Sequence, residues 1–318
     1  MNTIRFFGAD DVFRLLDTGD CIRLTRETLA GLASGQGRQY LRGHVALPNS
    51  NLLAFMPAWL DGQYFGAKIL SIYHDNQTAG LPSHQGGALL FDSKSGAPVA
   101  LVDAFALTQV RTGAVSAVAT DLLARPDASR LCLLGCGSQA ISHLQAIRLV
   151  RGLTRVTAWD IDPERAKAFA AAWSAETGLP VAAEPTAWAA IDGADIVCTL
   201  TPSRVPILEP DWIAPGTHIN AVGACRPDDR ELPSMLMARA RVFGDARESV
   251  LAEAGDFLIP MKEGLFGEEW LLGTIGELAL GSVRGRVSAD DVTVFEALGL
   301  AIEDIAAAKH VYEAGTRG

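Results

Sequence analysis

The chain has 318 residues, of which 49% are hydrophobic, so it is long enough to build two domains with large buried cores. Its 27 Lys and Arg residues against 37 Asp and Glu residues give a net charge of −10, which excludes a strongly basic protein with a nucleic-acid partner. No apolar run is long enough to span a membrane, and residues 1–11 lack the apolar core of a signal peptide, so we expect a cytoplasmic protein without a membrane partner.

The cysteines and histidines predict neither disulfides nor a metal site. The five cysteines are odd in number and include no CxxC pair, which is untypical of a disulfide framework. The six histidines are scattered along the chain, without the HxxxH or HExxH spacing of zinc ligands.

The first part of the chain predicts two helices followed by strands. A helix capped by Asp10 and Asp11 is expected to continue to about Gly19, and residues 22–33 predict a second helix. Between residues 39 and 73 the apolar runs become short and broken, which is typical of antiparallel strands.

A hairpin and a long helix are expected next. Residues 87–91 and 98–103 have the pattern of two hairpin arms, with a turn at residues 93–96. Residues 107–123 then predict an alanine-rich helix.

A glycine turn joins a predicted buried strand to a predicted helix in the middle of the chain. Leu131–Leu134 is an uncharged apolar run, and residues 138–151 carry apolar side chains at helical spacing. A strand, a turn and a helix in this order aim a helix N-terminus at a phosphate group. Gly135 permits the tight turn, Gly137 lets the backbone approach a pyrophosphate, and Ala140 allows close packing of helix and strand.

Further strands alternate with helices after this turn. The strand at residues 155–160 ends in Asp160, 25 residues after Gly135, which is close to the spacing of a carboxylate that binds an adenosine ribose. More strand patterns follow at residues 194–200, 218–223 and 240–245. The alternation predicts a parallel, doubly wound sheet.

We therefore expect an α/β protein with a Rossmann-type dinucleotide-binding domain over residues 126–291. Residues 290–313 predict one long amphipathic helix, with Val294 among its apolar positions. This helix is expected to pack on the N-terminal part, so that residues 1–125 and about 292–318 form a second, α+β domain.

Four separated stretches resemble the ornithine cyclodeaminase/mu-crystallin family, and they are most similar to its mu-crystallin-like ketimine and imine reductase branch. They occur in the family's order and cover most of the chain, and together they are specific although none would suffice alone. The stretches are residues 82–85 with 96–103 and 107–117, then 135–140, 219–232 and 293–304.

The resemblance implies a homodimer whose N-terminal domains pair through a shared sheet. The α+β domain is then the substrate-binding and dimerisation domain. Family members use NAD or NADP on small amino or imino acids. Their activities include cyclodeamination of ornithine or lysine, alanine dehydrogenation and reduction of cyclic ketimines.

Three basic positions are candidates for holding a substrate carboxylate. Lys68 lies in the apolar run Phe65–Leu70, where a lysine is costly to bury without an anion, and it matches the family's substrate-contacting lysine, the catalytic residue expected here. Arg111 lies on a nearly uncharged helix, where its planar guanidinium suits a carboxylate or a cofactor phosphate. By resemblance Arg42 is a second carboxylate clamp, with Arg38 as the alternative. A snorkelling surface lysine and a buried structural ion pair are the plainer interpretations of Lys68 and Arg111.

Two further residues are assigned to the same substrate-binding wall. The stretch around His84 is similar to one that lies near the ligand in mu-crystallin-like members, although a lone histidine is more often structural. Met56 belongs either to this wall or to the hydrophobic core.

Cys225, which is also placed among the substrate-binding residues, distinguishes between the possible reactions. By resemblance, ornithine cyclodeaminases carry at this position an aspartate that assists the amine, whereas mu-crystallin-like reductases carry a small residue. An ordinary thiol is mostly protonated at neutral pH and does not replace that carboxylate, so Cys225 favours imine reduction. The nearby Asp228 and Glu231 are expected to turn and cap their loop.

The cofactor is expected to be NAD, with NADP as the alternative. Asp160 and Asp162 would repel the 2′-phosphate of NADP, and Arg165 is expected to face water one turn into the next helix. The residues assigned to cofactor binding are Arg111, Thr112, Gly135, Gly137, Ser138, Gln139, Asp160, Thr201, Val222 and Gly223.

These observations favour an NAD(P)-dependent oxidoreductase that acts on the C–N bond of a small amino or imino acid. Reduction of a cyclic ketimine of the pyrroline- or piperideine-2-carboxylate type is the first hypothesis. Cyclodeamination of ornithine or lysine, giving proline or pipecolate plus ammonia, is the second. A non-catalytic, crystallin-like ligand-binding protein is the third.

Overall fold

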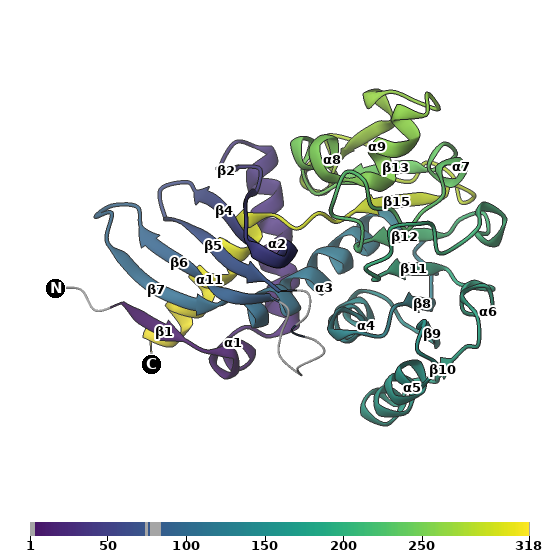
Figure 1. The fold of residues 1–318 in the computed structure, drawn as a ribbon, viewed down its shortest axis with the longest axis horizontal. Coiled ribbons are helices and arrows are strands. Elements are labelled where there is room, and N and C mark those ends of the chain that lie inside the picture. Colours follow the sequence, from purple (N-terminus) through teal and green to yellow (C-terminus); the bar gives the residue numbers. More distant parts are fainter. Residues whose placement is uncertain (1–3, 74–75, 77–83, 318) are drawn as a thin grey trace. The chain divides into compact units, whose positions relative to one another are not determined.

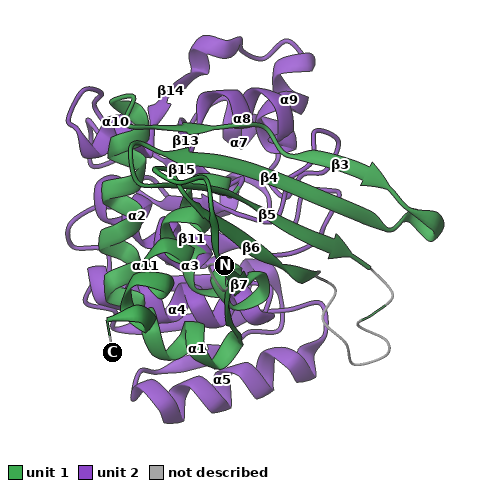
Figure 2. Cartoon of the chain, turned by 90° about the vertical axis from the view of Figure 1, so that its left-hand side faces the viewer, with its two compact units in different colours: residues 1–111, 299–318 green, residues 112–298 purple. Residues whose placement is uncertain are grey.

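A computed structural model of the protein describes residues 4–73, 76 and 84–317. The chain folds into two units (Figure 2). Unit 1 comprises residues 1–111 and 299–318, and unit 2 comprises residues 112–298.

Unit 1 is built on a mostly antiparallel sheet with the strand order β1-β7-β6-β5-β4-β2, in which β3 also pairs with β4. The strands β1 and β7 pair in parallel, and the other pairs are antiparallel. The strands are β1 (Arg5–Phe7), β2 (Gly37–Gln39), β3 (Gly43–Ala46), β4 (Leu52–Leu60), β5 (Tyr64–Ile72), β6 (His84–Asp92) and β7 (Pro98–Asp103). The antiparallel strands and the hairpin expected from the sequence are therefore confirmed.

One face of this sheet is covered by α11 (Ala301–Thr316), which crosses β4 and β5, and α2 (Thr18–Ala33) packs against α11 (Figure 1). The packing is close, because a Cβ added to Gly66 of β5 would lie 3.0 Å from Ile305 Cδ1 of α11. The other helical segments of this part of the chain are α1 (Ala9–Leu15), η1 (Pro48–Ser50) and the first turns of α3 (Ala104–Leu123).

The first helix ends earlier than the sequence analysis expected. Helix α1 ends at Leu15 rather than near Gly19, and α2 begins at Thr18. The reason is Asp17, whose side chain accepts a hydrogen bond from Asp20 N at 2.9 Å and so caps α2.

Unit 2 contains an eight-stranded sheet with the order β10-β9-β8-β11-β12-β15-β13-β14, and its neighbouring strands all pair in parallel. The strands are β8 (Arg130–Leu134), β9 (Arg155–Trp159), β10 (Val181–Ala183), β11 (Ile196–Thr199), β12 (His218–Ala221), β13 (Arg241–Gly244), β14 (Leu271–Thr274) and β15 (Thr293–Glu296). From β8 the chain adds β9 and then β10 on one side of the sheet, and it then returns to add β11 and β12 on the other side. This reversal creates the switch point of a doubly wound sheet between β8 and β11. The predicted α/β Rossmann-type architecture is confirmed.

Helices connect most of these strands, as a parallel sheet requires. The helical segments of unit 2 are α4 (Ser138–Val150), α5 (Pro163–Thr177), α6 (Ala187–Ile191), η3 (Pro210–Trp212), α7 (Ser234–Met237), α8 (Arg247–Glu253), α9 (Gly255–Lys262), η4 (Glu268–Trp270) and α10 (Ile275–Ala279). Figure 1 shows α4, α5 and α6 in the part of unit 2 that carries β8, β9 and β10.

The prediction of one helix over residues 290–313 was wrong. Residues Thr293–Glu296 form β15 inside the parallel sheet, and α11 begins only at Ala301. Gly299 separates the two elements with φ +77°, a left-handed conformation that interrupts a helix.

The division into units also differs from the expected boundaries near residues 125 and 291. Helix α3 crosses the first boundary, because its later residues pack within unit 2. A Cβ at Gly113 would lie 2.4 Å from Ser142 O of α4, and Thr120 Oγ1 accepts a hydrogen bond from Asn220 of β12. The second boundary follows β15, which is an integral strand of the unit 2 sheet.

Among the described residues, no helix is both long enough and apolar enough to cross a membrane. In the same part of the chain, no group of three or more His, Cys, Asp or Glu side chains is arranged to hold a metal ion.

Candidate functional site

The glycine turn after β8 has the geometry of a phosphate-binding loop. Gly135 has φ +102°, and a Cβ there would lie 2.9 Å from Leu200 O, so only glycine fits. Gly137 precedes the first turn of α4, which has no side-chain cap, and a Cβ at Gly137 would meet no described atom within 4 Å. A phosphate group at this turn would meet the positive end of a 13-residue helix. Ser138 and Gln139, also assigned to the cofactor, are the first two residues of that helix.

Asp160 ties the glycine turn to the turn that follows β9. Its side chain is buried, with Oδ2 accepting a hydrogen bond from Cys136 N at 2.8 Å and Oδ1 accepting one from Asp162 N at 2.9 Å. A carboxylate has further lone pairs for ribose hydroxyls, so ribose binding is compatible with these bonds. The sequence analysis assigned only the ribose role to Asp160 and did not anticipate that it also holds the loop. Arg165 is exposed, as expected.

A buried glutamate organises the loops after β11 and β12. Glu231 Oε1 accepts hydrogen bonds from Thr201 N at 2.7 Å and Thr201 Oγ1 at 2.5 Å, while Oε2 accepts one from Gly223 N at 2.9 Å. Burial raises the pKa of Glu231, and these hydrogen bonds lower it in part. Thr201, Val222 and Gly223, all assigned to the cofactor, thus lie on two loops that Glu231 holds together. The capping role expected for Glu231 agrees with these bonds.

Two further buried carboxyl groups lie near Glu231. Asp256 Oδ1 accepts hydrogen bonds from the N atoms of Glu231 and Leu232, at 2.9 and 2.8 Å. Burial, followed by the charge of Glu231, raises the pKa of Asp256 to about 8. Burial and the neighbouring Asp256, Asp245 and Glu231 also raise the pKa of Glu296 well above its ordinary value. Burial and mutual repulsion therefore favour the protonated forms of these two carboxyl groups.

Cys225 is half-buried in the loop after β12. Its thiol donates a hydrogen bond to Val222 O at 3.3 Å and lies 3.8 Å from Ala297 O, just beyond β15. The thiol is therefore held at the carboxyl ends of two adjacent parallel strands, the edge at which such sheets bind ligands.

In unit 1, the structure brings Lys68 and Arg111 together around two acidic residues. Lys68 Nζ lies 2.7 Å from Asp304 Oδ2 and donates a hydrogen bond to Thr108 Oγ1 at 3.3 Å. Arg111 Nε donates to Asp304 Oδ1 at 3.1 Å, and its Nη1 donates to Glu303 Oε2 at 3.3 Å. The Lys68 side chain is 2% exposed and that of Asp304 0%, so these charges interact away from water.

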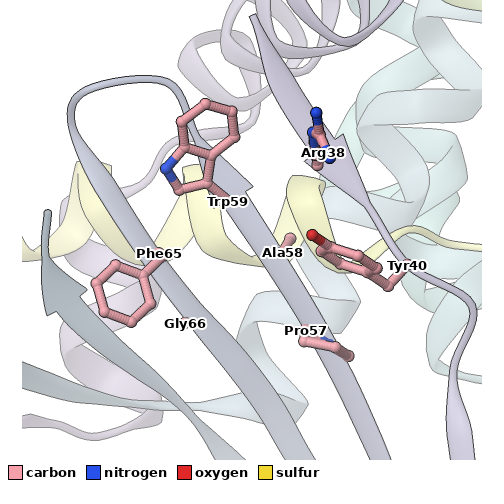
Figure 3. A pocket seen from close by; sticks show the side chains of 7 residues that line it. All are labelled: Arg38, Tyr40, Pro57, Ala58, Trp59, Phe65 and Gly66. Atoms are coloured by element: carbon pink, nitrogen blue, oxygen red, sulfur yellow. The ribbon is translucent and has the colours of Figure 1, made fainter. Parts of the chain in front are cut away.

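Arg42 lies beside this cluster through Gly299. Its Nη2 donates to Gly299 O at 3.2 Å, and a Cβ at Gly299 would lie 2.7 Å from Arg111 Nη1. Position 299 therefore requires glycine for two reasons: its φ is positive, and a side chain there would clash with Arg111. The alternative clamp, Arg38, instead lies on β2, is exposed, and borders an open cavity with Tyr40 and Trp59 (Figure 3).

The remaining predicted residues have simpler positions. Met56 is buried on β4 directly opposite Lys68 of β5, so both side chains lie on the same face of the sheet. Thr112 is buried on α3 next to Arg111. His84 is the first residue of β6, and its side chain lies outside the described part of the structure.

The sequence analysis missed Glu303 and Asp304, although it used their stretch as part of the family resemblance. Two adjacent carboxylates in the apolar run Leu298–Ala308 are as costly to bury as Lys68 in β5. Opposite charges that are both costly to bury can compensate each other, so the sequence could have suggested that Lys68 pairs with this acidic segment. The structural ion pair considered for Arg111 is present, and it involves Lys68 as well.

Comparison with known proteins gives a consistent assignment. The sequence profile of the ornithine cyclodeaminase/mu-crystallin family matches residues 6–318. A Delta(1)-pyrroline-2-carboxylate reductase from Bacillus cereus is 37% identical over 265 residues, which are 83% of this chain and 81% of that protein. The ketimine reductase mu-crystallin of Mus musculus is 37% identical over 267 residues, or 84% and 81% of the two chains.

Two solved structures are also similar over nearly the whole chain. The Delta(1)-pyrroline-2-carboxylate reductase of Thermococcus litoralis, in complex with NADH and L-proline, has a TM-score of 0.95 and 34% identity, covering 98% of this chain and 97% of that one. An archaeal alanine dehydrogenase dimer with bound NAD has a TM-score of 0.94 and 32% identity, covering 99% and 96%. The resemblance inferred from four sequence stretches is confirmed, and the chain belongs to the ornithine cyclodeaminase/mu-crystallin family.

Proposed function

We propose that this protein is an NAD(H)-dependent reductase of a small cyclic α-imino acid, of the pyrroline-2-carboxylate or piperideine-2-carboxylate type. The observation that carries the proposal is the buried cluster of Lys68 and Arg111 beside Arg42, in a chain that also has a dinucleotide-binding fold. The named reductases among its relatives support the same reaction class.

The charge of the cluster suits one carboxylate. Lys68, Arg111 and Arg42 contribute three positive charges, and Glu303 and Asp304 contribute two negative ones, so one positive charge is in excess. An ammonium group has three N–H donors; Lys68 donates one hydrogen bond to Thr108 Oγ1, and its Nζ forms an ion pair with Asp304 Oδ2. A further N–H can reach a substrate carboxylate, with Arg42 as the second clamp.

The nicotinamide cofactor supplies the hydride chemistry when it is bound. The chain's residues hold the substrate carboxylate through Lys68 and Arg42, and Met56 provides an apolar wall beside Lys68. The protonated imine accepts the hydride at carbon, its C=N π electrons become the nitrogen lone pair, and a neutral secondary amine results. No protein acid is needed for this step, because the imine nitrogen already carries its proton.

NAD is the preferred cofactor in this proposal. The glycine turn and the first turn of α4 fit the pyrophosphate, and Asp160 stands at the end of β9 with a carboxylate that favours ribose hydroxyls over a 2′-phosphate. The solved relatives bound to NADH and NAD support this choice.

Cyclodeamination of ornithine or lysine is the second candidate. The thiol of Cys225 donates to a backbone carbonyl and offers no carboxylate to assist an amine. This observation favours the reductase over the cyclodeaminase.

A homodimer formed through the unit 1 sheet is part of the proposal. The face of this sheet opposite α11 is apolar yet open, with Phe6 69% and Phe55 46% exposed. A cavity of about 500 Å³ opens on β2, β4 and β5, bordered by Trp59 and Phe65 (Figure 3). Apolar side chains cluster here, and a second copy of the chain would cover them. The face includes Phe6, Val45, Leu53, Phe55, Ile69 and Leu101.

A substrate panel tests the reaction. Purified protein is given NADH with pyrroline-2-carboxylate or piperideine-2-carboxylate, and NAD with ornithine or lysine, and products are identified by mass spectrometry because cyclodeamination leaves the cofactor unchanged overall. We expect proline or pipecolate from the imines. Efficient conversion of ornithine to proline and ammonia without imine reduction would refute the proposal, and binding without turnover would support the crystallin-like alternative.

Sedimentation equilibrium tests the dimer. We expect a wild-type dimer and a monomer for Phe55→Glu. The control is Met235→Glu, at a comparably exposed apolar position of unit 2, which should remain dimeric. A wild-type monomer would contradict the dimer without affecting the reaction assignment.

A further inference from the structure

The two carboxylate oxygens of Asp304 contact two different basic side chains in unit 1. Its two oxygens divide between two cations: Oδ2 lies 2.7 Å from Lys68 Nζ, and Oδ1 accepts a hydrogen bond from Arg111 Nε at 3.1 Å. One carboxylate therefore fixes the spacing between a cation of β5 and a cation of α3. Lys68, a proposed substrate ligand, and its neighbour Arg111 thus share one counter-charge.

The neighbouring acid has a different set of partners. Glu303 Oε2 is 3.3 Å from Arg111 Nη1 and also accepts a hydrogen bond from Leu300 N at 3.3 Å, which caps α11. The two adjacent carboxylates are thus chemically similar and equally buried, yet Asp304 is the one in contact with Lys68. They form a matched pair for comparison.

The protonation of Lys68 follows from the groups around it. Burial and, to a smaller extent, the charges of Arg111 and Arg42 lower the pKa of Lys68, the charge of Asp304 offsets part of this, and the resulting pKa is about 8. The elements packed here also bring Thr108, which accepts from Lys68, and Cys21, a buried thiol of α2 near Glu303 with its pKa raised to about 12. Among these groups, Asp304 is the contact that favours the charged form of Lys68.

We propose that Asp304 is a positioning residue that fixes Lys68 against Arg111, so that Lys68 is oriented toward the substrate carboxylate, and that it keeps Lys68 protonated in its buried site. The inference rests on the proposed function, since it assumes that charged Lys68 binds the carboxylate. Asp304 lies in the first turn of the 16-residue helix α11, where a negative charge interacts favourably with the helix dipole.

The first test is the pH dependence of kcat/KM for imine reduction. In the wild type, loss of the Lys68 proton should lower kcat/KM above about pH 8. In Asp304→Asn this decline should move to lower pH by roughly 1–3 units, the usual effect of an opposite charge at short range. In Glu303→Gln the decline in kcat/KM should stay within about half a pH unit of the wild type, because Glu303 contacts Arg111 and not Lys68. Lys68→Arg should remove the part of the decline that Asp304→Asn moves, and any decline that remains in Lys68→Arg reports titration of the imine itself.

A second readout is independent of turnover. The chain has five lysines, so the 13Cε signal of Lys68 in lysine-labelled protein can be assigned by its loss in Lys68→Arg and titrated directly by NMR. The Lys68 pKa should fall in Asp304→Asn and be retained in Asp304→Glu, which keeps the charge. If Asp304→Asn does not fold, Asp304→Glu and Glu303→Gln still decide between the outcomes. The proposal is overturned if Asp304→Glu lowers the pKa of Lys68, or if Glu303→Gln lowers that pKa more than Asp304→Glu does.

The outcomes also separate this inference from the proposed reaction. A wild type that does not reduce imines would refute the proposed function, whatever the NMR titration shows. An active wild type whose kcat/KM profile and Lys68 titration are both unchanged in Asp304→Asn would refute the role of Asp304 alone.

Discussion

Replacing Lys68 by Met should destabilise unit 1 and lower activity for two separable reasons. The substitution retains an apolar stem of similar length but removes the charge facing Asp304 at 2.7 Å. Removing one member of a buried ion pair typically costs about 3–5 kcal/mol, because the other charge stays buried. Asp304 keeps Arg111 at 3.1 Å, so we expect the lower end, about 3 kcal/mol.

The double variant Lys68→Met/Asp304→Asn isolates the pair. Coulomb's law at 2.7 Å with an effective dielectric constant of 20 gives roughly 6 kcal/mol as an upper bound, and measured coupling energies in such networks are about 0.5–3 kcal/mol. We therefore expect the double variant to be about 2–3 kcal/mol more stable than the sum of the single effects predicts. Urea unfolding of all four proteins at one pH measures this coupling.

Among these four proteins, we expect the changes in kcat/KM to differ from the changes in stability. Loss of a charge-assisted contact to the substrate carboxylate costs about 1.5–3 kcal/mol, or roughly a 10- to 150-fold decrease in kcat/KM. The double variant lacks the same contact and should stay as impaired as Lys68→Met, while NADH binding, followed by fluorescence, stays close to wild type in both. Additive stabilities, or recovery of kcat/KM in the double variant, would refute this account of Lys68.

Three other perturbations test the cofactor site and the buried carboxyl groups. Asp160→Asn should narrow or reverse the preference for NADH over NADPH, measured as the ratio of kcat/KM values; a wild type that prefers NADPH would contradict our assignment. Cys225→Asp should not increase imine reduction and should reduce it if the added charge disturbs the site, as steady-state kinetics will show. The raised pKa values of Asp256 and Glu296 mean that the folded protein binds protons that the unfolded chain releases, so stability should fall as pH rises from about 4 to about 8. Glu296→Gln should flatten that fall in urea midpoints measured across this range, and an unchanged slope would argue against it.

The strength of a sequence pattern decided how well each element was predicted. The run Leu131–Leu134 was correctly predicted to be a strand, because Gly135 and the helical pattern after it limit the run to a length typical of a strand. The segment around Val294 is different, since it is buried on all sides and its apolar residues satisfy helical and strand spacing alike. Periodicity cannot separate a buried strand from a helix there, and the sheet that contains β15 is assembled from distant segments.

The choice between Arg38 and Arg42 shows a similar limit for the site. Both arginines lie in the short segment Arg38–Arg42, and no local pattern distinguishes them. The pairing of β2 with β4 sets Arg38 opposite Trp59 on the exposed side, whereas Arg42 lies past the end of β2 and reaches Gly299. Such a distinction depends on strand register, which only the folded sheet determines.

The assignment of Lys68 shows how a correct physical argument can leave its partner undetermined. A lysine in an apolar strand requires an anion, and the sequence analysis took that anion to be the substrate. The chain itself supplies one in Asp304, far away in sequence and adjacent in the fold. The requirement for an anion therefore identifies the site but not its occupant. The substrate role of Lys68 depends instead on the donor that Asp304 and Thr108 leave for a ligand and on the positive charge that the cluster retains, and the Lys68→Met and Asp304→Asn variants test these two properties separately.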